Sequence, residues 1–219
     1  MGIVVLCDFD GTVMEIDTSE VVLEKFAVGD WKTYDEQLEK REINIEECME
    51  KQFAMVRAAE DEILRQLEPV AVFRPNFNNL VNYCSARRIP FILASAGLDF
   101  VINHFLRVKG LQELVSVRSP KAECTTRGMK LTFPSLFEEG SLGLKDDLVM
   151  YYKRRGRRVV YIGDGSPDYP AAIKADHLFV IENSRLEDLC RRERIPHKAI
   201  RDFREVLEAL VRIETANSA

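Results

Sequence analysis

The hydrophobic pattern of the chain begins with a five-residue apolar run, residues 3–7, that leads directly into acidic residues. The run is mostly β-branched or aliphatic and carries no charge, which predicts a short strand buried on both faces. Residues 89–95, 159–162 and 178–181 predict further buried strands, the last of them final in the chain, and residues 114–117 predict a short one. Buried strands without polar alternation are typical of a parallel sheet.

Helical periodicity lies between these strands. Residues 77–84 carry an amphipathic face, and residues 100–109 predict a helix that ends at Gly110. Further helices are expected over residues 148–152, 169–174 and 203–210. The alternation of buried strands and helices predicts an α/β fold, a doubly wound parallel sheet covered on both faces.

One long helical segment interrupts the alternation. From residue 17 to residue 72 the apolar residues recur at helical spacing and no strand is expected. We therefore predict an all-helical domain, residues 17–72, inserted into a sheet domain formed by residues 1–16 and 73–219. Its expected hinges are residues 13–17 and 69–75.

Residues 119–143 contain two prolines and three glycines with little periodicity, which predicts an irregular excursion with a hairpin around Arg127 and Gly128.

Length and charge narrow the class of protein. The 219 residues suffice for one core domain with a smaller inserted one, and the formal net charge of −5 argues against a nucleic acid or an anionic membrane as the main partner. Residues 153–158 are basic, but they fall where a helix should end, and a helix dipole favours cations there. We therefore interpret this run as a solvated helix end.

The remaining composition predicts a cytoplasmic protein. No run approaches the ~20 apolar residues that span a bilayer, and the short apolar start does not resemble a signal peptide. The five cysteines and three histidines are scattered, without the spacing of a disulfide framework or a zinc site. The cysteines are expected to be reduced, with His104 on a helix and His177 and His197 in loops.

Acidic residues follow two of the predicted strands. Asp8 and Asp10 come directly after residues 3–7, and Gly11 then permits a sharp turn; Asp164 and Asp168 follow residues 159–162. The first pair alone fits an ordinary turn equally well. Two acidic clusters at the carboxyl ends of buried strands, however, predict a ligand site, because carboxylates at a core need a compensating cation. We expect a metal and a nucleophile at this edge.

Residues 8–12 and 163–168 resemble the first and fourth motifs of the haloacid dehalogenase superfamily of phosphatases and phosphotransferases. Ser95, which closes a predicted strand, and Lys145, which precedes a predicted helix, resemble its second and third motifs. The resemblance spans nearly the whole chain. It implies a Rossmann-like core with the first strand central, and it implies that the helical insert is a cap over the aspartates.

The resemblance also implies roles for the acidic residues. Asp8 would be the nucleophile that forms an aspartyl-phosphate, and Asp10 would be the general acid and base, with its backbone carbonyl on the metal. Asp8, Asp164 and Asp168 would hold Mg, Asp168 either directly or through a water. A small phosphorylated metabolite would be the substrate.

Four further residues would bind the phosphate, namely Ser95, Ala96, Gly11 and Lys145. A hydroxyl at the end of a strand can donate a hydrogen bond to a phosphoryl oxygen, and an ammonium offsets negative charge on both Asp8 and the transferred group. Lys121 and Lys130 are alternatives to Lys145, but Lys145 stands at the start of a helix, as the superfamily's lysine does.

Several functions share these motifs. Asp10 argues for phosphate chemistry, because the dehalogenases of the superfamily lack the second aspartate. A phosphotransferase or phosphomutase remains an alternative, and an inactive binding or regulatory module is a remote one.

Within the superfamily, the chain resembles the branch of phosphoserine phosphatases and of the methionine-salvage phosphatase that acts on a methylthio-pentenyl phosphate. Asp17 and Lys51 stand where phosphoserine phosphatases have a Glu and an Arg for the substrate, although Asp17 also fits a helix N-cap. The identity of the substrate and the oligomeric state stay open.

Overall fold

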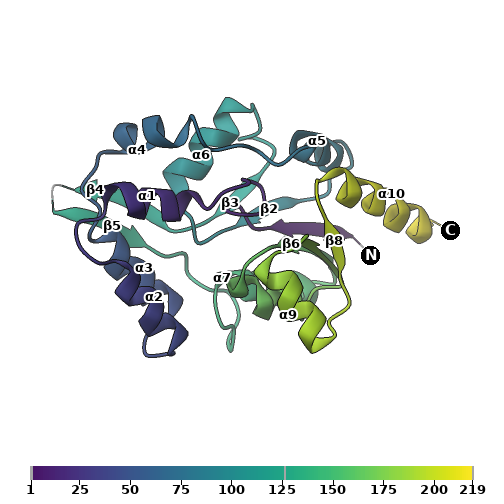
Figure 1. The fold of residues 1–219 in the computed structure, drawn as a ribbon. Helices are drawn as coiled ribbons and strands as arrows, with labels where there is room; N and C mark the ends of the chain where they lie inside the picture. Colours follow the sequence, from purple (N-terminus) through teal and green to yellow (C-terminus); the bar gives the residue numbers. More distant parts are fainter. Residues whose placement is uncertain (1, 126, 219) are drawn as a thin grey trace.

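Six parallel strands form the centre of the computed structural model, which describes residues 2–125 and 127–218 (Figure 1). Their order across the sheet is β3-β2-β1-β6-β7-β8, so that β1 is central as predicted. The strands are β1 (Ile3–Cys7), β2 (Phe91–Ala94), β3 (Ser116–Arg118), β6 (Arg158–Gly163), β7 (His177–Ile181) and β8 (Lys198–Ile200). The prediction of a parallel α/β sheet is confirmed.

Helices cover both faces of this sheet, because alternate residues of each strand point to opposite sides. Val5 and Cys7 of β1 pack with α5, α6 and α10, which lie above the sheet in Figure 1. Val4 and Leu6 pack with α7, α8 and α9 on the other face. The helices are α5 (Phe77–Ala86), α6 (Asp99–Val108), α7 (Leu144–Arg154), α8 (Tyr169–Ala172), α9 (Arg185–Glu193) and α10 (Arg204–Ser218), with the short helix η1 (Ser166–Asp168) before α8.

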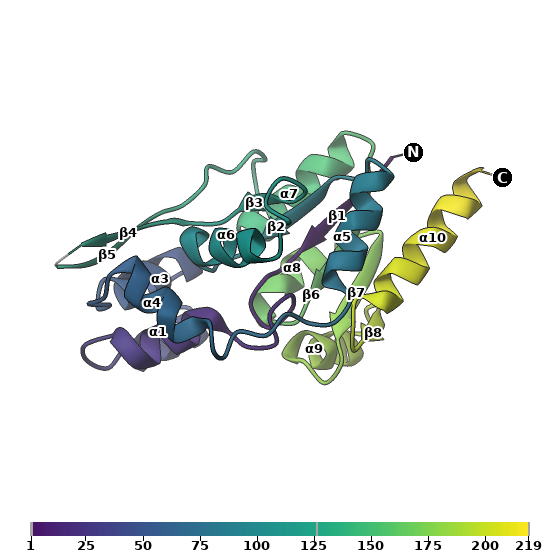
Figure 2. The ribbon, with the colours of Figure 1, turned by 90° about the horizontal axis from the view of Figure 1, so that it is seen from above.

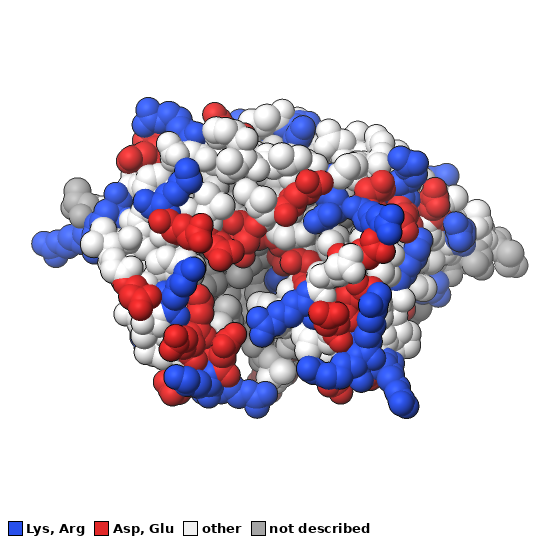
Figure 3. Space-filling view, viewed as in Figure 1, with Lys and Arg blue, Asp and Glu red and all other residues white. Residues whose placement is uncertain are grey.

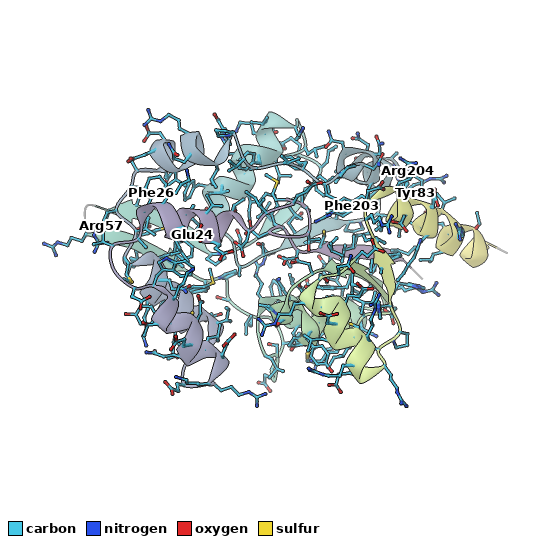
Figure 4. The ribbon with its side chains drawn as sticks, viewed as in Figure 1. Glu24, Phe26, Arg57, Tyr83, Phe203 and Arg204 are labelled. Carbon is cyan, nitrogen blue, oxygen red and sulfur yellow. The ribbon has the colours of Figure 1, made fainter. Side chains whose placement is uncertain are left out.

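Four helices lie between β1 and α5, in the segment 17–72 that we call the helical insert. They are α1 (Thr18–Phe26), α2 (Lys32–Glu39), α3 (Ile45–Phe53) and α4 (Glu60–Leu67). Phe26 and Arg57 lie side by side at one end of the insert (Figure 4), where the Arg57 N–H donates to the Phe26 carbonyl at 3.1 Å. Buried residues of the insert, such as Leu23 and Phe53, belong to the same apolar cluster as α5, α6 and α10. The insert therefore shares its core with one face of the sheet.

The two chain crossings between the sheet and the insert run side by side. Met14 and Phe73 form an antiparallel bridge, and the Arg74 N–H donates to the Val13 carbonyl at 2.8 Å. The Arg74 guanidinium also donates to the carbonyls of Gly11 and Thr12, each at 2.8 Å. We call this pair of crossings the connecting ribbon.

The predicted hairpin is present within residues 119–143. Strand β4 (Lys121–Thr125) pairs antiparallel with β5 (Gly128–Thr132), and the hairpin extends beside the insert in Figure 2. It packs on α3 so closely that a Cβ at Gly128 would lie 2.1 Å from the Ala54 carbonyl oxygen. The insert thus contacts strands as well as helices.

The carboxyl-terminal part of the sheet differs from the prediction. The strand β7 is not the last, because α9 and β8 follow it, and His177 begins β7 rather than lying in a loop. Beyond β8, Phe203 packs on Phe77 of α5 with ring centroids 5.2 Å apart, and Figure 4 shows Phe203 and Tyr83 where α5 and α10 meet.

The basic run behaves as predicted, because α7 ends at Arg154 and both Arg154 and Arg155 pair with Glu138. None of the helices in the described ranges is long and apolar enough to cross a membrane.

Candidate active site

Three strand ends meet at the site. Asp8 follows β1 and its N–H donates to the Ile162 carbonyl of β6 at 2.9 Å. Asp164 follows β6, and Ser95 follows β2 with its N–H donating to the Arg118 carbonyl at 3.1 Å. The strand order reverses between β1 and β6, and the carboxyl ends of strands at such a point form the crevice in which α/β proteins bind ligands.

Three carboxylates face one ammonium in this crevice. Oxygens of Asp8, Asp164 and Asp168 all lie within 4.8 Å of one another. Lys145, in the first turn of α7, places its Nζ 2.7 Å from Asp8 Oδ2 and 2.6 Å from Asp168 Oδ1. Three carboxylates and one ammonium leave two negative charges without a partner in the cluster.

The electrostatics of the cluster follow from this excess. Burial raises the pKa of Asp8 well above its usual value, although Lys145 opposes the shift. Burial likewise raises the pKa of Asp164 to about 6. Burial alone would lower the pKa of Lys145, but Asp168 and Asp8 outweigh it, so the pKa is raised and the ammonium is held charged. A divalent cation with oxygen ligands fits this cluster in charge and in donor type.

Asp168 is fully buried and its carboxylate accepts four hydrogen bonds. Oδ1 accepts from Lys145 Nζ and from the Tyr161 hydroxyl, both at 2.6 Å. Oδ2 accepts from the N–H groups of Asp164 and Gly165 at 3.0 and 2.8 Å. Asp168 therefore holds the lysine and the loop that carries Asp164. Tyr161 was not among the predicted site residues, although a tyrosine in an otherwise aliphatic strand is a signal for a buried polar partner.

Asp10 turns away from the three-carboxylate cluster toward the insert. Its Oδ1 accepts from the backbone N–H of Thr18 at 2.9 Å and from the Thr18 hydroxyl at 2.5 Å. Burial and the neighbouring Asp17 raise the pKa of Asp10 to about 7. Its Oδ2 faces Gly97, where a Cβ would lie only 2.4 Å away. A carboxyl group with this pKa suits proton transfer near neutral pH.

The turn after β1 is built against Asp164. Gly11 has a φ of +70°, and a Cβ there would lie 2.3 Å from Asp164 Oδ2, so both its conformation and its surroundings favour glycine. The Thr12 hydroxyl donates to Asp164 Oδ1 at 2.6 Å. On the opposite side, the buried Ser95 hydroxyl accepts from the Gly97 N–H at 2.9 Å.

A cavity of about 270 Å³ lies over these groups, between the sheet and the insert. Figure 3 shows acidic side chains around the hollow on this face of the molecule. The cavity brings together seven of the residues that the sequence singled out: Asp8, Asp10, Asp17, Ser95, Ala96, Lys145 and Asp164. Of the other three, Gly11 and Asp168 do not line the cavity but contact Asp164.

Lys51, the third of these residues, does not line the cavity either. Its side chain is exposed, with Nζ 5.7 Å from the centre of the Tyr34 ring. The next residue, Gln52, lines the cavity instead and donates to Asp35 Oδ1 at 2.8 Å. One residue along a helix turns the side chain by about 100°, which accounts for the difference. Asp17 lines the cavity and also caps α1, accepting from the Glu20 N–H at 2.9 Å.

The family model for haloacid dehalogenase-like hydrolases matches residues 5–172. The chain belongs to this family, and the match covers both acidic motifs and the helical insert.

The chain is also similar to several phosphatases. The chain is 27% identical over 217 residues to the 2-hydroxy-3-keto-5-methylthiopentenyl-1-phosphate phosphatase of Brevibacillus brevis, covering 97% of this chain and 96% of that protein. The enzyme of the same name from Geobacillus kaustophilus is also 27% identical, with 97% of each chain covered. A solved phosphoserine phosphatase, captured as a phospho-aspartyl intermediate analogue, shares the fold with a TM-score of 0.69 at 16% identity, over 95% of this chain and 98% of that one. The family makes the chain a haloacid dehalogenase-like hydrolase, and the relatives to which it is similar are phosphatases.

Proposed function

We propose that the chain is a Mg-dependent phosphomonoester hydrolase that forms an aspartyl-phosphate on Asp8. The observation that carries the proposal is the position of Asp8, at the end of the central strand, against Lys145 and within 4.8 Å of Asp164 and Asp168. Asp8, Asp164 and the Asp10 backbone carbonyl would hold the ion, with Asp168 bracing them. Bound there, Mg would neutralise negative charge on the phosphoryl oxygens.

The residues of the chain supply the two displacement steps. In the first, a carboxylate oxygen of Asp8 attacks phosphorus while the bond to the leaving oxygen breaks, and Asp10 gives that oxygen its proton. In the second, water attacks the phosphorus of the aspartyl-phosphate, Asp10 takes a proton from the water, and the Asp8 carboxylate is restored as inorganic phosphate leaves. Ser95 and Lys145 hold phosphoryl oxygens throughout.

We also propose that residues 17–72 act as a cap on a core formed by residues 1–16 and 73–219. The cavity over Asp8 is lined from both sides, by Asp17 and Gln52 of the insert and by Ser95 of the core. Closure of such an insert would exclude bulk water during phosphoryl transfer and admit it for hydrolysis.

The substrate is a small phosphorylated metabolite. The named relatives act on 2-hydroxy-3-keto-5-methylthiopentenyl-1-phosphate, and we propose an ester of this kind rather than phosphoserine. Among the described residues that line the cavity, Lys145 is the one cation, and it already contacts Asp8 and Asp168. The carboxylate of phosphoserine would therefore meet the acids Asp17 and Asp35 without a free cation.

The test is release of inorganic phosphate from a panel containing the methylthiopentenyl ester, phosphoserine, sugar phosphates and p-nitrophenyl phosphate, with Mg and with a chelator. We expect Mg-dependent release, greatest for the methylthiopentenyl ester. Repeating the assay with added alcohols and sugar phosphates as acceptors separates hydrolysis from the phosphotransferase alternative. Loss of ester without stoichiometric phosphate would favour transfer, and no turnover of any ester would favour the inactive module.

A further inference from the structure

A second cavity, of about 310 Å³, adjoins the first. It lies between α2 and α3 of the insert on one side and residues 133–144 on the other, and its walls are mainly apolar. Leu38, Ile45 and Met49 come from the insert, and Phe133, Leu142 and Leu144 come from the facing segment. We propose that this cavity is a subsite for an apolar, uncharged end of the leaving alcohol, so that the enzyme selects phosphate esters with such an end.

The two cavities share part of their lining at the site of chemistry. Ser95, Ala96 and Lys145, which would hold the phosphate, line both of them, as do Ile45 and Met49 of α3. A phosphate seated between Ser95 and Lys145 therefore has its ester oxygen within reach of the second cavity.

Charge decides which part of a substrate enters which cavity. The first cavity is lined by Asp10, Asp17, Glu20 and Asp35, so it suits hydroxyl groups or a cation near the phosphate. The second is lined by few charges, and its Asp146 already accepts from the Leu142 N–H and pairs with Lys174. Among the described residues, a carboxylate finds no free cation in either cavity, because Lys145 already contacts Asp8 and Asp168. An alkyl or thioether group would instead bury apolar surface in the second cavity.

The wall of the second cavity includes an apolar side chain that packs against little of the protein. Leu142 is 76% exposed, and it lies in the segment that faces the insert. An apolar group of a ligand in this cavity would cover the Leu142 side chain and remove its apolar surface from water.

The inference rests on the proposed phosphatase activity, so its test separates binding from turnover. Binding of ethylphosphonate and n-pentylphosphonate, which cannot be hydrolysed at a P–O ester bond, is measured by calorimetry with Mg present. In parallel, kcat/KM is measured for ethyl phosphate and n-pentyl phosphate. We expect the pentyl compounds to bind and react at least tenfold better than the ethyl compounds, since a methylene in an apolar pocket typically contributes about tenfold or more.

Two exposed leucines of the same segment provide a matched pair of variants. Leu142→Asn should reduce the pentyl preference at least threefold without changing the values for the ethyl compounds. Leu136→Asn, at a leucine 42% exposed that does not line the cavity, should leave both unchanged. Leu38→Asn tests the opposite wall and should act like Leu142→Asn.

The outcomes distinguish the two proposals. Equal binding of ethyl and pentyl phosphonates, or a pentyl preference unaffected by both Leu142→Asn and Leu38→Asn, would overturn the subsite. Tight, Leu142-dependent binding of pentylphosphonate without hydrolysis of any ester would support the subsite and contradict the phosphatase mechanism.

Discussion

Thr18 fixes Asp10 with two donors that converge on a single oxygen. Its backbone N–H and its hydroxyl lie 2.9 and 2.5 Å from Asp10 Oδ1, and both groups are shielded from solvent. Thr18 is also the first residue of α1. The proposed acid and base of the reaction is therefore oriented by the start of the insert and not by the sheet that carries the nucleophile.

Thr18→Val should impair proton transfer to poor leaving groups. Valine keeps the backbone N–H but removes the hydroxyl donor, so Asp10 loses one of its two restraints. We expect kcat for an alkyl phosphate to fall about tenfold while KM changes less than twofold, because the acid acts on the departing oxygen. Steady-state kinetics with alkyl phosphate and p-nitrophenyl phosphate check this.

Thr18→Ser is the control, since serine retains the hydroxyl. It should restore kcat to within about threefold of wild type. An equal loss with p-nitrophenyl phosphate, whose leaving group needs little protonation, would show that the residue acts through general folding instead.

Asp8→Asn should abolish turnover and leave the fold intact. The amide of asparagine is not a nucleophile. The substitution also removes one negative charge from a crowded cluster, which should raise the unfolding free energy of the metal-free protein by about 1 kcal/mol. Phosphate release and urea unfolding measure the two effects. Lys51→Ala, at an exposed residue outside the cavity, should keep kcat/KM within twofold. Wild-type turnover in Asp8→Asn would disprove the assignment of the nucleophile.

Lys145→Met should destabilise the protein as well as inactivate it. Asp168 is fully buried and would lose its charged donor, and a buried charge without its partner typically costs about 3 kcal/mol. Lys153→Met, on the same helix, removes a lysine that is 40% exposed and paired with Asp176, and should cost less than about 1 kcal/mol. Comparable losses of unfolding free energy in the two variants would contradict the structural role of Lys145.

The acidic cluster should make the stability of the metal-free protein depend on pH. The pKa of Asp164 is about 6 in the folded state, above its ordinary 3.8, so protonated Asp164 favours folding. This contribution is complete below pH 4 and is lost as the pH rises through 6. Asparagine does not titrate, so Asp164→Asn lacks this loss. Between pH 4.5 and pH 7.5, the unfolding free energy of wild type should therefore fall by about 1–2 kcal/mol relative to that of Asp164→Asn.

Magnesium should cancel this disadvantage at pH 7.5 in wild type and have a smaller effect on Asp164→Asn, since the ion would bind the charged carboxylates. Urea titrations at the two pH values, with and without the ion, give all four free energies. An identical pH dependence of the unfolding free energy in both proteins would show that the pKa of Asp164 is not raised by folding.

The contiguous motifs could be predicted from sequence because each acid directly follows a buried strand. Asp8 and Asp164 are placed by the ends of β1 and β6, and Lys145 by the start of α7. Tyr161 was missed because its partner, Asp168, comes from the next turn of chain and only the fold brings its hydroxyl to Oδ1. Gln52 was missed in favour of Lys51 because packing of the insert decides which face of α3 points into the cavity.

The end of the sheet was missed for a different reason. Helix α9 offers only Leu186, Leu189 and Cys190 as apolar residues among many charges, and β8 is three residues long. Where the sequence pattern is this weak, tertiary contacts decide which elements form. Leu186 and Cys190 are fully buried against the sheet.

The connecting ribbon has a mechanical consequence. Because the two crossings are hydrogen-bonded to each other, they join the insert to the sheet as one two-stranded connection and not as two independent tethers. This connection adds to the apolar core that the two parts share. Arg74, within the connecting ribbon, donates hydrogen bonds to the carbonyls of Gly11 and Thr12, in the turn that follows Asp8. If the insert moves as the cap that we propose, the movement would be transmitted through Arg74 to the turn after Asp8 and through Thr18 to Asp10. Opening the site would then also displace the proposed acid and base.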